Sequence, residues 1–127
     1  MAAAGIRDLL IANQIVGAPK IARLIGLQRH AEVKVLVDSA ENAEALAAEA
    51  SAVGVALRVL IEVDVGMGRA GVPPGEAAIA LARKIKTLPA LELVGVAGWE
   101  GHTTEIADEG EKAQSIERAV TALTTTA

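Results

Sequence analysis

The chain has 127 residues, of which 52% are hydrophobic, so it is long and apolar enough for one modest domain with a buried core. Its formal net charge is −4 and its lysines and arginines are scattered, which argues against nucleic acid as a partner. It contains no cysteine, which excludes disulfides, thiolate metal sites and cysteine nucleophiles.

Short apolar segments that predict strands alternate with alanine-rich segments that predict helices. The predicted strands are residues 9–12, 33–37, 57–65 and 91–97. The predicted helices are residues 19–27, 40–53, about 75–87 and 106–123. Pro19 suits a first helical turn, Asp38 or Ser39 is expected to cap the second helix, and Gly54 is expected to end it.

Four successive β–α units, with no hairpin signal between them, predict a parallel sheet with helices outside it. Polar or glycine-rich residues follow each predicted strand, at residues 13–14, 38–39, 64–71 and 98–103. Folds of this α/β class bind ligands at the carboxyl ends of their strands, so we expect the site there. Periodicity alone does not distinguish an open doubly wound sheet from part of a closed barrel.

Residues 58–71 form an apolar strand that carries Glu62 and Asp64 and then enters a glycine-rich turn holding Arg69. Unpaired carboxylates are costly to bury, so these acids indicate that charge is needed at the end of the strand. A strand that simply ends in solvent, with Arg69 as a surface cation, explains the pattern equally well.

The same turn contains a Gly-x-Gly-x-x-Gly pattern, which raises the hypothesis of a dinucleotide site. That motif requires a helix to begin at its last glycine, but Pro73 and Pro74 delay the helix here. Glu92 has the spacing of the ribose-binding acid but lies at the start of its strand. We therefore give the nucleotide hypothesis little weight.

Three runs carry a family resemblance: LIANQIVGAPK at 10–20, EVDVGMGRAGV at 62–72 and GVAGWEGH at 95–102. They resemble the D-threonine aldolase and D-serine dehydratase group, whose members are related to the alanine racemase N-terminal domain. The resemblance covers nearly the whole chain and implies a single domain over residues 1–127, a partial TIM-type (β/α) barrel of about four units, with pyridoxal 5'-phosphate (PLP) as cofactor. It also implies an internal fragment, with the Schiff-base strand upstream and a C-terminal β domain downstream.

The resemblance implies roles for two charged residues. Arg69 matches the arginine of an Asp-x-Gly-Met-x-Arg motif, which contacts the phenolic oxygen of the cofactor, and a guanidinium stays charged at any working pH. Glu62 occupies the position of a modified lysine in the racemases and would supply the negative charge that orients Arg69. A simple structural ion pair of Arg69 with Glu62 or Asp64 is the alternative.

Three further residues are candidates for the site. Trp99, the only aromatic residue, matches a position where relatives pack a histidine or tyrosine against the pyridine ring, although it would also suit a buried core. His102 follows in a Gly-x-x-Gly-His pattern and is a candidate for contact with substrate or for a purely structural role. Gln14 is expected to contact cofactor or substrate, with turn capping as the alternative.

No lysine of the chain has the setting of a Schiff-base residue, because each falls on a predicted helix or near the entry end of a predicted strand. The five are Lys20, Lys34, Lys84, Lys86 and Lys112. We therefore assign no catalytic residue besides the candidate His102, and no metal ligand. As an isolated chain we expect it to be inactive and marginally folded, since an open half-barrel exposes strand edges and an apolar face.

The function implied by the resemblance is PLP-dependent cleavage of D-3-hydroxy amino acids to glycine and an aldehyde. D-serine dehydration, amino-acid racemization and non-catalytic PLP binding are the alternatives. In the full-length protein the resemblance allows a divalent metal and a homo-oligomer. The chain has neither a signal peptide nor an apolar run near the roughly twenty residues of a membrane span, so we expect a cytoplasmic protein with no membrane partner.

Overall fold

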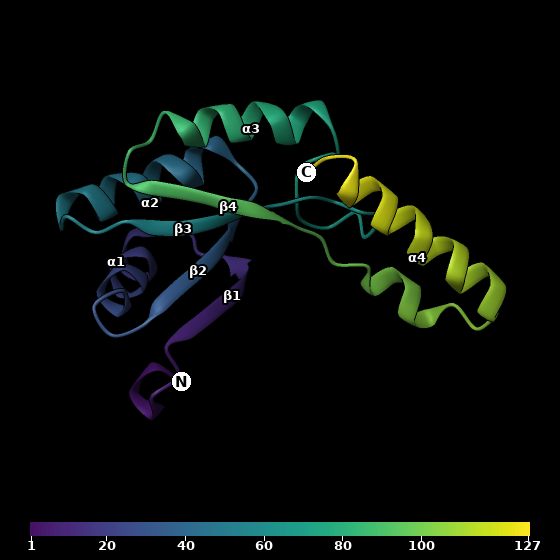
Figure 1. Ribbon diagram of the computed structural model, residues 1–127, viewed down its shortest axis with the longest axis horizontal. Coiled ribbons are helices and arrows are strands. Elements are labelled where there is room, and N and C mark those ends of the chain that lie inside the picture. The colour runs from purple at the N-terminus through teal and green to yellow at the C-terminus, as the bar shows by residue number, and fades with distance from the viewer.

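Four parallel strands form one sheet, and the computed structural model describes all residues from 1 to 127 (Figure 1). The strands are β1 (Asp8–Gln14), β2 (Glu32–Val37), β3 (Leu57–Glu62) and β4 (Leu91–Ala97). The α-helices are α1 (Ala18–Leu27), α2 (Ala40–Ala52), α3 (Glu76–Lys86) and α4 (Glu109–Thr124). Two short 3₁₀ helices, η1 (Ala2–Ala4) and η2 (Gly101–Glu105), complete the chain.

The strands lie in the order β1-β2-β3-β4, and α1, α2 and α3 all pack on one face of the sheet (Figure 1). A doubly wound sheet reverses its strand order and carries helices on both faces, whereas a (β/α) barrel has neither feature. The fold is therefore a partial parallel (β/α) barrel. Helix α4 extends away from the sheet beside η2 (Figure 1).

The core lies between the sheet and these three helices. Val35, Val37 and Val59 are fully buried on the helix-facing side, where α2 contributes Leu46 and α3 contributes Ile85. Because side chains alternate along a strand, the residues between these valines face the opposite side of the sheet. That opposite side is the open face, which corresponds to the interior of a barrel and has no helix covering it.

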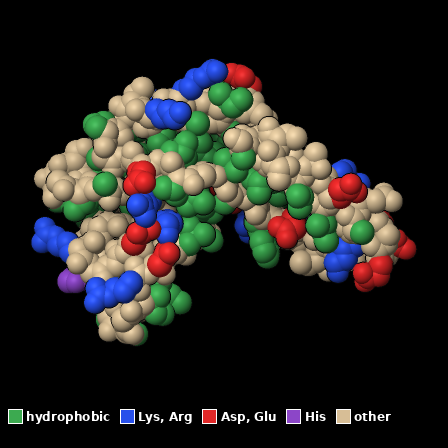
Figure 2. Space-filling model, viewed as in Figure 1, with side chains coloured by type: hydrophobic (Ala, Val, Ile, Leu, Met, Phe, Trp, Pro, Cys, Tyr) green, Lys and Arg blue, Asp and Glu red, His purple; other side chains and the backbone are tan.

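A row of alternating charges crosses the open face near the amino ends of the strands. Glu32 of β2 lies between Lys34 and Arg58, at 2.8 and 2.6 Å. Lys34 also reaches Asp8 of β1 at 2.6 Å, and Arg58 of β3 reaches Glu92 of β4 at 3.0 Å. The row joins all four strands, and Figure 2 shows it as a cluster of red and blue side chains.

Two predicted boundaries differ from the structure by three residues each, and β1 also extends to Gln14, so residues 13 and 14 belong to that strand. Strand β3 ends at Glu62, not residue 65, because Val63 makes only an isolated bridge to Val72 as the chain folds back. Helix α4 begins at Glu109, not residue 106, because residues 101–105 form η2 and Asp108 caps α4. Of the two predicted caps of α2, Asp38 and Ser39, the structure selects Ser39, and Gly54 follows that helix with a positive φ, as expected.

No helix combines the length and the apolar character that crossing a bilayer would require.

Candidate functional site

The turn that carries Arg69 leaves the carboxyl end of β3 and is closed by backbone hydrogen bonds at its base. The amide of Asp64 donates to the carbonyl of Val72, and the amide of Val72 donates to the carbonyl of Glu62, both at 2.9 Å. We call residues 63–72 the arginine loop. It does not open a helix, since α3 begins only at Glu76, so the structure lacks the arrangement that a dinucleotide fingerprint needs.

Asp64 organises the first half of the arginine loop. Its Oδ1 accepts hydrogen bonds from the amides of Gly66 and Gly68, each at 3.0 Å. The bonds from Gly68 and then Gly66 are the main reason that the pKa of the Asp64 carboxyl lies below its ordinary value. The aspartate is therefore held ionised within the turn, and its charge is satisfied by the backbone.

Gly71 closes the second half of the arginine loop, and no other residue fits there. Its φ is +96°, and a β-carbon would lie 2.6 Å from the amide nitrogen of Asp64. Its own amide donates to Oδ2 of Asp38 at 3.2 Å, which ties the loop to the end of the neighbouring strand β2. The loop is thus fixed both to its own strand and to the next one.

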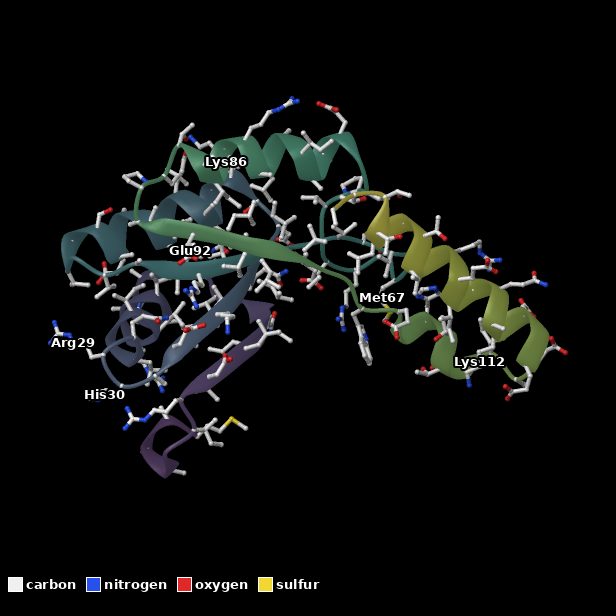
Figure 3. The ribbon with its side chains drawn as sticks, in the orientation of Figure 1. Arg29, His30, Met67, Lys86, Glu92 and Lys112 are labelled. Atoms are coloured by element: carbon white, nitrogen blue, oxygen red, sulfur yellow. The ribbon has the colours of Figure 1, made fainter.

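A hollow of about 390 Å³ opens at the carboxyl ends of the strands on the open face. Glu62, Arg69 and Trp99 line it, over apolar walls that include Leu10 and Leu36. The hollow has the size of a small-molecule site. In Figure 3, Met67 marks the arginine loop between the sheet and η2. The structure therefore brings together three of the residues that the sequence singled out.

Gln14 joins this group through Glu62. A register shift in β1 between Ile11 and Gln14 places Gln14 opposite Leu36, and its Nε2 donates to Oε2 of Glu62. Glu62 is only 8% exposed, and this hydrogen bond gives its carboxylate a polar partner across two strand spacings. Turn capping was the alternative role for Gln14, but the side chain that accepts a local backbone hydrogen bond is that of Asn13. Its Oδ1 accepts from the amide of Gln14.

Arg69 is exposed and forms no ion pair. The salt bridges of the chain are those of the charged row and two helix-surface pairs, and none includes Arg69. The alternative in which Arg69 pairs with Glu62 or Asp64 is therefore not realised. Its guanidinium is available for an anion from outside the chain.

Trp99 follows β4 and is 54% exposed, so the buried-core alternative for this residue is wrong. Its indole lies against Gly101, where a β-carbon would approach Nε1 to 2.3 Å. The glycine thus makes room for the ring in its observed position. An aromatic ring that is exposed beside a hollow offers a flat surface to a ligand.

His102 does not line the hollow. It lies in η2 and packs against Gly66 of the arginine loop, with its Nδ1 buried and without a hydrogen-bond partner. The other histidine, His30, is exposed between α1 and β2, far from this end of the sheet (Figure 3). No lysine lines the hollow either, and Lys86 on α3 and Lys112 on α4 both lie away from it (Figure 3).

Sequence reasoning missed two residues of this site. Asp38 was placed among the polar residues at the carboxyl ends of the strands, but the only individual role predicted for it was that of a helix cap. Gly101 was noted only as the second glycine of the Gly-x-x-Gly-His pattern, and no role was predicted for it. Position 101 must be glycine because the indole of Trp99 folds back against it. No local sequence pattern predicts that placement of the ring.

Comparisons with known proteins agree with this geometry. Residues 2–127 match the family described as alanine racemase, N-terminal domain. A D-threonine aldolase from an Arthrobacter species is 36% identical over 117 residues, which are 92% of this chain and 31% of that protein. A 3-hydroxy-D-aspartate aldolase from Paracoccus denitrificans is 36% identical over 98 residues, which are 76% of this chain and 25% of that protein.

Solved structures show the same likeness. D-threonine aldolase from Filomicrobium marinum superimposes with a TM-score of 0.95 at 31% identity, over 99% of this chain and 34% of that one. D-threo-3-hydroxyaspartate dehydratase from Delftia sp. HT23 gives a TM-score of 0.75 at 28% identity, over 97% of this chain and 35% of that one. The chain therefore spans between 25% and 35% of the length of these four relatives.

Proposed function

Because this chain belongs to the alanine racemase N-terminal domain family, we propose that it forms one wall of the PLP site of an aldehyde-lyase that cleaves D-3-hydroxy amino acids. The products would be glycine and an aldehyde. One observation carries the proposal: an unpaired arginine and a half-exposed tryptophan face the same hollow at the carboxyl ends of the strands. Two relatives that are named aldolases support this choice of reaction.

The residues of the hollow fit a flat anionic ring. Arg69 supplies a permanent positive charge that has no salt-bridge partner in the chain, and the indole of Trp99 supplies an apolar surface that is about half exposed. PLP combines a planar pyridine ring with an anionic phenolic oxygen, so one ligand would satisfy both residues. The apolar walls around Leu10 and Leu36 suit the rest of such a ring.

Each residue then has a distinct task. Arg69 would hold the phenolic oxygen and Trp99 would pack against the face of the ring. Glu62, held in place by Gln14, would set a negative charge in the same hollow, which keeps the guanidinium of Arg69 directed inward. When bound, PLP acts as the electron sink that permits cleavage of the bond between the α- and β-carbons of the substrate.

We do not assign the lysine that would attach PLP covalently to any residue of this chain. All five lysines lie outside the hollow, so we expect the isolated 127-residue chain to release no aldehyde from D-threonine. A divalent metal, a homo-oligomer and a cytoplasmic location stay predictions from the family resemblance and the composition.

The test uses the protein expressed from its complete reading frame. We expect it to bind PLP, measured by absorbance titration, and to release acetaldehyde and glycine from D-threonine. Arg69→Ala should weaken PLP binding at least about tenfold, since a hydrogen bond to a charged group is lost. Arg83→Ala is the matched control, because Arg83 is an exposed arginine on α3 that pairs only with Glu76.

Two results would overturn the proposal: a parent protein that does not bind PLP, or binding that Arg69→Ala leaves unchanged. The alternative function is dehydration, which the name of the similar Delftia structure suggests. It predicts ammonia and a keto acid in place of glycine and an aldehyde. Non-catalytic PLP binding predicts Arg69-dependent affinity with no product at all. The product analysis therefore separates the three functions.

A further inference from the structure

We propose that Asp38 is a positioning residue for Arg69, acting through the amide of Gly71; the inference rests on the proposed function and adds a residue to its site. Asp38 lies at the end of β2, and Arg69 lies in the arginine loop after β3. The aspartate does not line the hollow, so its effect on a ligand would pass through the backbone of the loop.

The geometry places Arg69 between two fixed amides. The amide of Gly68 donates to Asp64 at 3.0 Å, and the amide of Gly71 donates to Asp38 at 3.2 Å. Only Arg69 and Ala70 separate these two anchors. A segment of two residues between two held amides has little freedom, and a ligand-binding side chain gains affinity when its backbone is held in the bound arrangement.

The two anchors differ in what they connect. Asp64 belongs to the arginine loop itself, so its bonds shape the turn without joining it to a neighbouring strand. Asp38 comes from the neighbouring strand, so its bond holds the far side of the loop to the sheet. Without this bond, the side of the loop that follows Arg69 would be held only at its base, where Val72 bonds to Glu62 and Asp64.

Asp38 is free to serve this role because another residue caps the helix that follows it. The side chain of Ser39 accepts from the amide of Asn42 and caps α2, which leaves the Asp38 carboxylate without a part in the helix. Asp38 also forms no salt bridge. The amide of Gly71 is therefore the hydrogen-bond partner of the Asp38 carboxylate.

The experiment measures PLP affinity of the protein from the complete reading frame in a double-mutant cycle of Asp38→Ala and Arg69→Ala. We expect Asp38→Ala to weaken binding about tenfold, the effect of one hydrogen bond to a charged group. In the Arg69→Ala background the same change should have no further effect, because the residue that it positions is gone. Ser39→Ala is the matched control, because it removes the neighbouring side chain that accepts a hydrogen bond from the amide of Asn42 and that has no bond to the arginine loop.

Hydrogen exchange gives a second readout that does not depend on the ligand. Asp38→Ala should speed exchange at the amide of Gly71, while Ser39→Ala should leave it unchanged. If Asp38→Ala does not fold, Asp38→Asn and Asp38→Glu replace it. The asparagine keeps an acceptor in place and should bind PLP nearly as the parent does, whereas the longer glutamate displaces the acceptor and should bind more weakly.

The outcomes separate this inference from the function on which it rests. A parent protein that binds no PLP overturns both. Binding that needs Arg69 but not Asp38 overturns this inference alone, as does an equal loss from Asp38→Ala in the presence and absence of Arg69. Weaker binding by Asp38→Asn than by Asp38→Glu also overturns it, because charge rather than the placed hydrogen bond would then be what matters.

Discussion

The imidazole of His102 occupies the space that a side chain on Gly66 would need. Its Cε1 and Nε2 atoms both lie 2.9 Å from the position of an ideal β-carbon on that glycine. The contact joins η2, which follows β4, to the arginine loop, which follows β3. The loop that carries Arg69 is thus supported by Asp38 from one neighbouring strand and by His102 from the segment after the other.

Gly66→Ala should destabilise the chain. The φ of Gly66 is +126°, and a left-handed or related backbone costs a non-glycine residue about 1–3 kcal/mol. The new methyl group would also collide with the ring of His102, so we expect a further loss beyond the backbone strain. Urea denaturation of the 127-residue chain, followed by circular dichroism, measures the free energy of unfolding.

The background His102→Ala isolates the contact from the strain. Once the ring is removed, Gly66→Ala should cost less than it does in the parent chain, because only the strained backbone is left. An equal cost in the two backgrounds would show that the imidazole yields freely and that the packing of His102 on Gly66 contributes nothing.

Gly101→Ala should move Trp99. A β-carbon at residue 101 would lie 2.3 Å from Nε1 of the indole, so the ring must leave its place. Because Trp99 is the only tryptophan of these 127 residues, its fluorescence reports the change directly, and we expect the emission maximum to shift. In the protein from the complete reading frame, the same substitution should weaken PLP binding if the indole packs against the ring.

Gly26→Ala is the control for this experiment. Gly26 lies in α1, where a β-carbon would meet nothing within 4 Å. This substitution should leave the emission unchanged and stabilise the helix by up to about 1 kcal/mol. If the fluorescence emission of Gly101→Ala is identical to that of the parent, the observed position of the indole against residue 101 is contradicted.

Asp64 makes stability depend on acid pH. Hydrogen bonds from the amides of Gly68 and Gly66 hold the pKa of its carboxyl below the ordinary value of 3.8. A group whose pKa is lower in the folded state stabilises the fold at pH values above its unfolded pKa, and this contribution is lost as the pH falls through the folded pKa. We therefore expect the free energy of unfolding to fall below about pH 4.

Asp64→Asn supplies the comparison for the pH series. Asparagine keeps an acceptor for the two amides but does not titrate in this range. The variant should be less stable than the parent at neutral pH and should lose less stability on acidification. Parallel curves for the two proteins between about pH 6 and pH 2 would show that Asp64 is not the titrating group.

The row of charges on the open face should make a contribution that salt weakens. Side-chain hydrogen bonds, and then the neighbouring opposite charges, raise the pKa of Lys34 and of Arg58 and lower that of Glu32, so all three groups stay charged at neutral pH. Arg58→Met removes the link between Glu32 and Glu92. Its effect on the urea midpoint should be larger at about 0.01 M salt than at about 1 M, because these groups are exposed to solvent.

Arg83→Met is the reference for the row, since it breaks one isolated exposed pair with Glu76. Isolated surface pairs contribute little, so this variant should stay close to the parent at both salt concentrations. If Arg58→Met shows no greater dependence on salt than Arg83→Met, the four-strand row acts as unrelated surface pairs.

The elements and their order could be read from the chain. Strands β2 and β4 and helices α1, α2 and α3 lie within two residues of their predicted limits, because each has a clear apolar period and an end marked by proline, glycine or a capping residue. The predicted carboxyl end of β3 and the predicted start of α4 were wrong. The end of β3 is set by the arginine loop and the start of α4 by η2. Both segments have an irregular backbone, so no periodic pattern of apolar residues marks where they begin or end.

The candidate site was only partly accessible from the sequence. The motif around Arg69 and the lone Trp99 pointed to the end of the sheet where the hollow lies, since the carboxyl ends of parallel strands meet there. The partners of these residues were not accessible. Gln14 meets Glu62 only because β1 shifts its register, and Asp38 meets Gly71 only because the arginine loop folds back toward β2.

The sequence by itself therefore determined the class of fold, the family and the end of the sheet that carries the site, because these depend on local periodicity and on motifs that are contiguous in the chain. The partial barrel, which periodicity left open, was implied by the family resemblance and confirmed by the strand order. The tertiary structure alone decided that Arg69 is left unpaired and that Asp38 and His102 support its loop. These contacts join residues from 33 to 36 positions apart, and such pairs are set by how strands and loops pack against one another.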